Sequence, residues 1–138
     1  MMVSTRGRYA LLVMMDLAQH EAEGFVSLKE VAERQQISMK YLEAIVGMLN
    51  RAGMLASKRG KEGGYRLLRP ASGYSIGEIL KLTEGSLAPV ACMEDQTCAD
   101  CAQSTGCQTL PLWKKLDDMI ESYLARVTLA DLMRGEMQ

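Results

Sequence analysis

The sequence predicts a mainly α-helical fold with one small β-hairpin, and three patterns in the chain support this prediction. Two short helical segments begin at capping serines and are joined by a tight turn. A basic, glycine-rich stretch then separates two short runs that are typical of strands. Toward the end of the chain, apolar residues recur at helical spacing over several turns, which indicates a long amphipathic helix.

The first helix is expected over residues 5–20, with Thr5 as its cap. Apolar residues fill most of its circumference, so it should be largely buried. Arg6 and Arg8 lie at its start, where the helix dipole disfavours cations. An external anion such as a phosphate would stabilise them, although two solvated arginines are an equally simple interpretation.

The next two helices form a predicted helix-turn-helix. Ser27 and Glu30 make a capping box for a helix over residues 28–34, and Ser38 caps a helix over residues 39–52. A short turn joins the two, as in the DNA-binding motif whose second helix enters the major groove. The leading exposed residues of that second helix can serve phosphates or base edges, and they are Ser38, Lys40, Tyr41 and Glu43.

A β-hairpin is expected over residues 54–68, with a turn at residues 60–64. Arg59 and Lys61 lie at its tip, and a basic tip on a narrow ribbon suits the minor groove. Helix-turn-helix and basic wing together predict a winged helix that binds double-stranded DNA, with Arg8 as a further contact. Residues 1–69 carry eleven Lys/Arg and seven Asp/Glu, whereas residues 70–138 carry five and ten, which suits a basic reading head and an acidic tail.

After the hairpin, Ser75 and Glu78 form a second capping box for a helix that packs back on the head. A long helix is then expected over residues 110–126, followed by a short one after Thr128. Five apolar residues at spacings of 3, 4, 3 and 4 form a coiled-coil seam, namely Trp113, Leu116, Ile120, Tyr123 and Val127. This seam predicts a homodimer, and packing within the chain is the alternative.

All four cysteines fall between Cys92 and Cys107, in the pattern C-x5-C-x2-C-x5-C. Clustered thiolates make disulfides, bind zinc or hold an iron–sulfur cluster. The chain shows no signal segment and no run of the ~18 apolar residues that a membrane span needs. A cytoplasmic protein without membrane contact is therefore expected, and this disfavours a structural disulfide.

An enzyme is not predicted, because the chain has no cofactor fingerprint and its single histidine, His20, lies near no candidate nucleophile. A pure protein-interaction module would need no basic wing.

Several segments of the chain together resemble the family of bacterial winged-helix regulators that includes the iron–sulfur regulator IscR, the nitric-oxide sensor NsrR and the cysteine-metabolism regulator CymR. The segments that carry the resemblance are residues 4–9, 37–43, 59–65, 112–113 and 127–132. It covers nearly the whole chain and implies a DNA-binding domain over residues 1–85, a cluster-binding loop over 86–109 and a dimerisation helix with tail over 110–138. The DNA target would be a palindromic operator.

IscR-like members place their third cysteine six residues before the tryptophan, as Cys107 stands before Trp113 here. The resemblance implies that Cys92, Cys101 and Cys107 hold an iron–sulfur cluster, with 2Fe–2S favoured over 4Fe–4S. The family's fourth ligand is a histidine at the place of Leu110 or an acidic residue at the place of Arg8. With both lost, Cys98 or an exogenous thiol is the expected substitute. Zinc, a redox thiol switch, or a CymR-like enzyme partner with no cluster remain alternatives.

Overall fold

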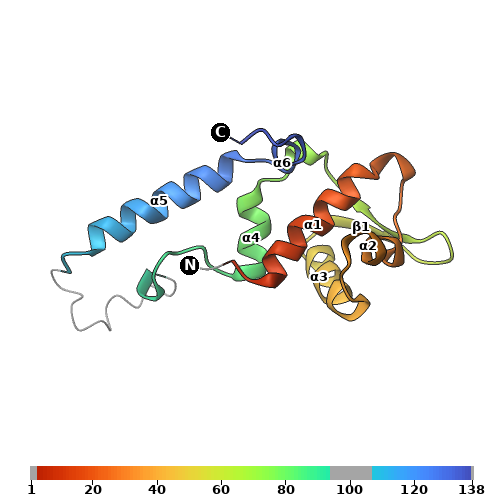
Figure 1. Cartoon of the computed structure of the whole chain (residues 1–138), viewed down its shortest axis with the longest axis horizontal. Helices are drawn as coiled ribbons and strands as arrows, with labels where there is room; N and C mark the ends of the chain where they lie inside the picture. Colours follow the sequence, from red (N-terminus) through yellow and green to blue (C-terminus); the bar gives the residue numbers. More distant parts are fainter. Residues whose placement is uncertain (1–2, 94–106, 138) are drawn as a thin grey trace.

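The computed structural model describes residues 3–93 and 107–137, and its α-helices and strands confirm a mainly helical fold with one hairpin. In chain order they are α1 (Thr5–Gln19), α2 (Leu28–Gln35), α3 (Met39–Arg51), β1 (Leu55–Lys58), β2 (Gly64–Leu67), α4 (Ile76–Glu84), α5 (Leu110–Arg126) and α6 (Leu129–Arg134). Three short 3-10 turns, η1 (Glu21–Glu23), η2 (Ala71–Gly73) and η3 (Ala91–Met93), lie between them. The hairpin and α5 extend from opposite ends of the body (Figure 1). No helix in the described ranges is long and apolar enough to cross a bilayer.

The helices begin where side chains cap their first turns. Ser27 Oγ and Ser38 Oγ each accept a backbone N–H from the residue three positions on, at 3.3 Å. Ser75 and Glu78 form both halves of a capping box. The prediction of Thr5 as the cap of α1 is wrong: the cap is Ser4, whose Oγ accepts the N–H of Gly7 at 3.2 Å.

The core is aliphatic and lies where α1 packs against the helix-turn-helix, the hairpin base and α4. Residues from every one of these elements are almost completely buried, including Met14, Leu17, Val31, Leu42, Ile45, Leu49, Leu55 and Ile79. The buried residues of α3 repeat at the spacing expected of one helix face, so its opposite face is left to solvent.

Within the described residues, one carboxylate, that of Asp16, is buried among these apolar residues. The Asp16 side chain of α1 is 1% exposed and receives two hydrogen bonds from the Arg34 guanidinium, at 2.9 and 2.7 Å. Gln35 Nε2 donates a third at 2.9 Å. Burial by itself raises the pKa of Asp16, but the hydrogen bonds from Arg34 and Gln35 outweigh it and hold that pKa below its ordinary value. The pair fixes α2, the first helix of the helix-turn-helix, on α1.

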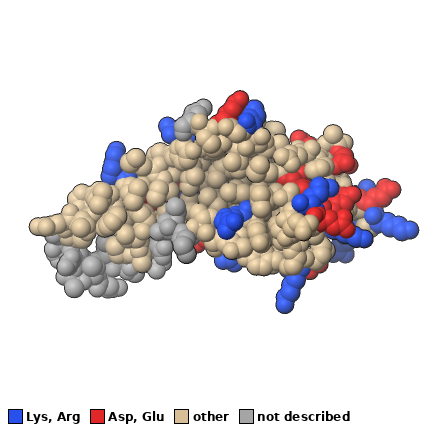
Figure 2. Space-filling model, in the orientation of Figure 1, with Lys and Arg blue, Asp and Glu red and all other residues tan. Residues whose placement is uncertain are grey.

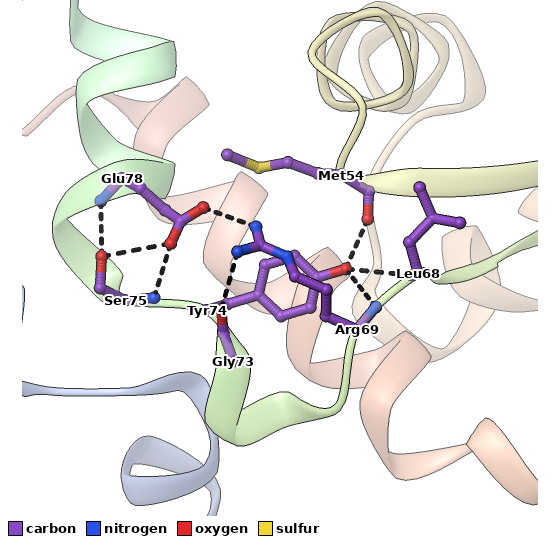
Figure 3. A network of polar contacts seen from close by, with 7 residues as sticks. All are labelled: Met54, Leu68, Arg69, Gly73, Tyr74, Ser75 and Glu78. Carbon is purple, nitrogen blue, oxygen red and sulfur yellow. Dashed lines mark hydrogen bonds and ion pairs between the residues drawn. The ribbon is translucent and has the colours of Figure 1, made fainter.

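The base of the hairpin is held by a second polar network, centred on the buried Tyr74 (Figure 3). Its hydroxyl donates to the Met54 carbonyl at 2.6 Å and accepts the N–H groups of Leu68 and Arg69 at 3.0 and 3.1 Å. The Arg69 guanidinium lies 4.1 Å from the Tyr74 ring and bonds Glu78 at the start of α4. Both ends of the hairpin are thereby joined to α4.

The chain that follows α5 returns to the same core. The Val127 carbonyl accepts the N–H of Ile76, and the N–H of Leu129 bonds the Tyr74 carbonyl, both at 2.9 Å. Val127 is only 6% exposed and packs among the core residues, so it differs from the sequence expectation that it belongs to a dimer seam. Val127 fits the 3, 4, 3, 4 spacing because such spacing does not tell whether an apolar residue packs within its own chain or against a second copy.

Candidate nucleic-acid interface and cysteine segment

The first turns of α3 present the four residues predicted to contact DNA. Ser38, Lys40, Tyr41 and Glu43 are all exposed, whereas Leu42, one helix position away, is fully buried. The structure therefore places the predicted residues on the exposed surface at the start of the second helix of the helix-turn-helix. A hydroxyl, an ammonium, a phenol and a carboxylate at this exposed helix start supply both donors and acceptors for phosphates and base edges.

Tyr41 is backed by α1, which the sequence analysis did not anticipate. The Tyr9 and Tyr41 rings meet edge to face, with centroids 5.4 Å apart. A shallow hollow beside Tyr41 is lined by Ser4, Arg6, Ala44 and Ile45. Residues two apart on an α-helix point about 200° apart, so Arg8 points away from the hollow that Arg6 lines. Of the two arginines at the start of α1, Arg6 is thus the one beside α3.

The predicted wing is a two-stranded antiparallel hairpin in which Leu55 pairs with Leu67 and Lys58 with Gly64. Arg59 and Lys61 lie in its turn and are exposed. On the face shown in Figure 2, charged side chains gather toward the wing end, while the surface over α5 is mostly uncharged. This distribution agrees with a charged DNA-reading head.

The start of α1 is tied to the end of α4, just before the cysteine segment begins. Ser4 Oγ donates to Glu84 Oε1 at 2.6 Å, and the Ser4 N–H donates to the same oxygen at 3.2 Å. A Cβ on Gly7 would lie 2.3 Å from Glu84 Oε1, so a larger residue at this position would displace the carboxylate from Ser4. The carboxylate also sits at the N-terminus of α1, where the helix dipole favours negative charge.

Two of the four predicted cysteine ligands, Cys98 and Cys101, lie outside the described residues. Cys92 and Cys107 are both partly exposed and are not in a disulfide. The Thr109 hydroxyl, 3.4 Å from Cys107 Sγ, and the backbone N–H groups of Thr109 and Leu110 stabilise the thiolate and lower the pKa of Cys107. Thiolate is the form that binds iron or zinc, so the donor chemistry of Cys107 fits such a group. Within residues 3–93 and 107–137, no three metal-binding side chains come together.

The long helix α5 divides its apolar residues between two faces. Ile120, Tyr123 and Leu124 pack in part against the core of their own chain. Leu112, Leu116 and Met119 are 59%, 37% and 58% exposed, and Trp113 is partly buried. The predicted seam thus straddles a face covered by the chain itself and a face that is open.

Comparisons with known proteins agree with this architecture. The family model Rrf2, described as an iron-dependent transcriptional regulator, matches residues 3–135. The chain belongs to the Rrf2 family. It is 39% identical over 134 residues to the HTH-type transcriptional regulator IscR of Vibrio atlanticus, covering 97% of this chain and 76% of that protein. It is 38% identical to the protein rrf2 of Nitratidesulfovibrio vulgaris, covering 97% and 88%.

Solved structures of Rrf2-type regulators have the same fold. IscR of T. potens superposes with a TM-score of 0.78 at 38% identity, over 98% of this chain and 88% of that one. CymR of B. subtilis, described as the global cysteine regulator, superposes with a TM-score of 0.79 at 35% identity, over 98% of both chains. The prediction of a winged-helix transcriptional regulator is confirmed, and these relatives are regulators of transcription, not enzymes.

The roles of four residues of this Rrf2 protein were not predicted from the sequence. These residues are Phe25, Tyr9, Glu84 and Arg34. Tyr9 and Glu84 act through contacts between elements far apart in the chain, and no local pattern signals them. Arg34 could have been inferred, because Asp16 is an acid flanked by apolar residues in a helix expected to be buried, and a buried carboxylate needs a partner.

Proposed function

We propose that the protein is a homodimeric DNA-binding regulator whose operator affinity is set by an iron–sulfur cluster at Cys92, Cys98, Cys101 and Cys107. The observation that carries the DNA-binding part is the exposed start of α3 beside the basic wing. Ser38, Lys40, Tyr41 and Glu43 would read the major groove, and Arg59 and Lys61 the adjacent minor groove. Among the residues at the start of α1, we favour Arg6 over Arg8 as the further phosphate contact, because Arg6 lines the hollow beside Tyr41.

Dimerisation would use the open face of α5. Leu112, Leu116 and Met119 form an apolar stripe that the chain itself leaves exposed, and covering it with the same stripe of a second copy follows coiled-coil logic. Trp113, Ile120 and Tyr123 would lie at the edge of that interface. Two reading heads related by a twofold axis then match a palindromic operator.

In the sequence, the cysteine segment (residues 92–107) lies between the DNA-binding part of the chain and α5. A group bound there is placed to change the position of the DNA-binding part relative to the dimer helix. Cys92, Cys101 and Cys107 would be the indispensable ligands, and Cys98 the fourth. A bound cluster would supply a redox-sensitive and iron-sensitive group at this position. The hydrogen bond between Ser4 and Glu84 joins the end of α4 to the start of α1. A movement of the chain after α4 would therefore be passed to α1, which lies beside the DNA-facing helix α3. Operator affinity would differ between the loaded and empty forms, which is the coupling.

The ligand assignment is tested by reconstituting single Cys→Ala variants without oxygen. Loss of cluster absorbance is expected for Cys92, Cys101 and Cys107, whereas Cys98→Ala should hold a cluster that is altered or labile. An unchanged spectrum for Cys98→Ala would move the fourth ligand elsewhere, and an unchanged Cys101→Ala would refute the assignment of the loop.

A second candidate keeps the DNA-binding fold and replaces the cluster by thiol-redox, zinc or protein-partner control. The likeness to CymR favours it, since a structure of Staphylococcus aureus CymR described as the oxidized form is 37% identical, with a TM-score of 0.76 over 96% of both chains. Anaerobic absorbance with iron and sulfide counts separates the two, because zinc and free thiols do not absorb visible light.

A further inference from the structure

The four basic residues of the wing fall into two environments. Lys58 and Arg66 lie over the ring of Phe25, whereas Arg59 and Lys61 lie in the turn beyond the paired strands. We propose that Phe25 is a positioning residue for DNA binding: it holds Lys58 and Arg66 on the outer face of the wing, so that Arg59 and Lys61 alone neutralise DNA phosphates there. The inference rests on the DNA-binding role proposed above.

The strand register explains why Phe25 faces these two cations. Val26 forms an isolated antiparallel β-bridge with Tyr65 of β2. The backbone N–H of each residue donates to the carbonyl of the other, both at 2.9 Å. Val26 is 1% exposed and faces the core. Because successive residues of a strand face opposite sides, Phe25 faces the outer side.

Lys58 and Arg66 belong to that same outer side. Leu55 and Leu67 pair across the hairpin and are both buried, so they face the core. Arg66 is the neighbour of Leu67, and Lys58 lies three residues from Leu55, which puts both on the other side. Phe25 thus meets one cation from each strand.

The contacts themselves are those of a cation held on a ring face. The Arg66 guanidinium carbon is 4.9 Å from the ring centroid of Phe25, and Lys58 Nζ is 5.9 Å from it. The wing can lie this close only because Gly64 has no side chain: a Cβ there would come within 2.1 Å of the Val26 carbonyl oxygen. Segment 25–26 therefore fastens the wing just before α2 begins.

The turn cations have no such attachment. Arg59 and Lys61 are exposed and make no ion pair or ring contact with any residue of the described ranges. Lys61 rims a hollow with Phe25 and Lys58, but its ammonium is not over the ring. Lys58 and Arg66 are held at the ring on the outer face of the wing, whereas Arg59 and Lys61 are left to meet DNA phosphates from the turn. Each phosphate that a protein cation neutralises releases counterions, so the two pairs should differ in the salt dependence of binding.

The test is the salt dependence of binding to a DNA duplex that the full-length protein selects from a random library, measured by fluorescence anisotropy. Arg59→Gln should lower the slope of log K against log salt by about 0.9, the value for one phosphate. Lys58→Gln and Arg66→Gln should leave the slope unchanged and weaken binding about threefold at every salt concentration, because the wing is less often in its binding position. Phe25→Leu should behave like these two, and Phe25→Tyr, which keeps the ring, should bind as the wild type does.

Ring-current shifts of the Lys58 and Arg66 side-chain protons give a readout independent of DNA, and they should vanish in Phe25→Leu and persist in Phe25→Tyr. A slope lowered as much by Lys58→Gln or Arg66→Gln as by Arg59→Gln would overturn the division of the wing while leaving DNA binding intact. Wild-type affinity in Phe25→Leu would overturn the positioning role. If Arg59→Gln also left the slope unchanged, two claims would be refuted. They are the division of the wing cations into ring-held and free pairs, and the proposed binding of the wing in a DNA groove.

Discussion

Removing the Arg34 guanidinium should destabilise the fold far more than removing an exposed arginine. In Arg34→Ala, the Asp16 carboxylate stays 1% exposed and loses two of its three side-chain hydrogen bonds, those of 2.9 and 2.7 Å. Removing one partner of a buried ion pair leaves the other charge buried without compensation, which lowers the free energy of unfolding by about 3–5 kcal/mol. The Arg34 side chain is 32% exposed, so water enters where it stood, and Gln35 still donates one bond. A loss of roughly 2–3 kcal/mol in the free energy of unfolding at pH 7 is therefore expected.

The pH dependence of this loss has a definite sign. In the wild type the pKa of Asp16 lies below its ordinary value, so the ionised carboxylate stabilises the fold at neutral pH and that stabilisation is lost as pH falls through the folded pKa. In Arg34→Ala the burial remains and the main opposing hydrogen bonds are gone, so the pKa of Asp16 rises and the carboxyl protonates in the folded state. The difference between variant and wild type should then shrink as the pH is lowered from 7 toward 4.

Urea unfolding followed by far-ultraviolet circular dichroism, at one fixed protein concentration, measures both effects. Arg134→Ala is the matched control, because Arg134 pairs with Asp131 and Glu136 at a position 53% exposed, where solvent screening leaves such pairs little effect on stability. Equal losses in the two variants at pH 7, or a loss for Arg34→Ala that stays constant down to pH 4, would refute the reasoning.

Three further substitutions probe the other contacts. Tyr74→Phe leaves a buried carbonyl and two N–H groups without their hydroxyl partner and should cost about 1–3 kcal/mol in urea unfolding, where no loss would show that the network is not needed. In Gly7→Ala the new Cβ would lie 2.3 Å from Glu84 Oε1, so this carboxylate must move and lose its hydrogen bonds to Ser4, and a loss of about 1 kcal/mol is expected. Gly47→Ala meets only the end of an arginine side chain at 3.2 Å and should be neutral or stabilising; equal effects would contradict the close approach. Met119→Glu, at a side chain 58% exposed in its own chain, should give folded monomers in sedimentation while the exposed control Lys114→Glu stays dimeric, and a dimeric Met119→Glu would place the interface elsewhere.

The sequence predicted the elements well where their signals are local. Ser27, Ser38 and Ser75 mark true helix starts, because capping depends on the residue and the turn that follows it. At the start of α1 two neighbouring hydroxyl residues compete, and Ser4 caps in place of Thr5 because Glu84, from the end of α4, bonds its hydroxyl. No pattern within the first helix carries information about that distant carboxylate.

The site shows the same limit. The exposed face of α3 could be predicted, because burial of the opposite face follows from periodicity. The choice between Arg6 and Arg8 and the division of the α5 seam could not, since each depends on which neighbour covers which side. Phe25 is the single phenylalanine of the chain, and its role emerges only when the register brings two strands of the wing against it.

The most direct test of the account is the affinity of one anaerobic preparation for its selected DNA duplex before and after the cluster is removed with a chelator. The account predicts visible absorbance with stoichiometric iron and sulfide in the first state, and an affinity that changes at least fivefold on removal, within the range of typical coupling energies of about 1–3 kcal/mol. A colourless protein, or an affinity that is the same in both states, would contradict it.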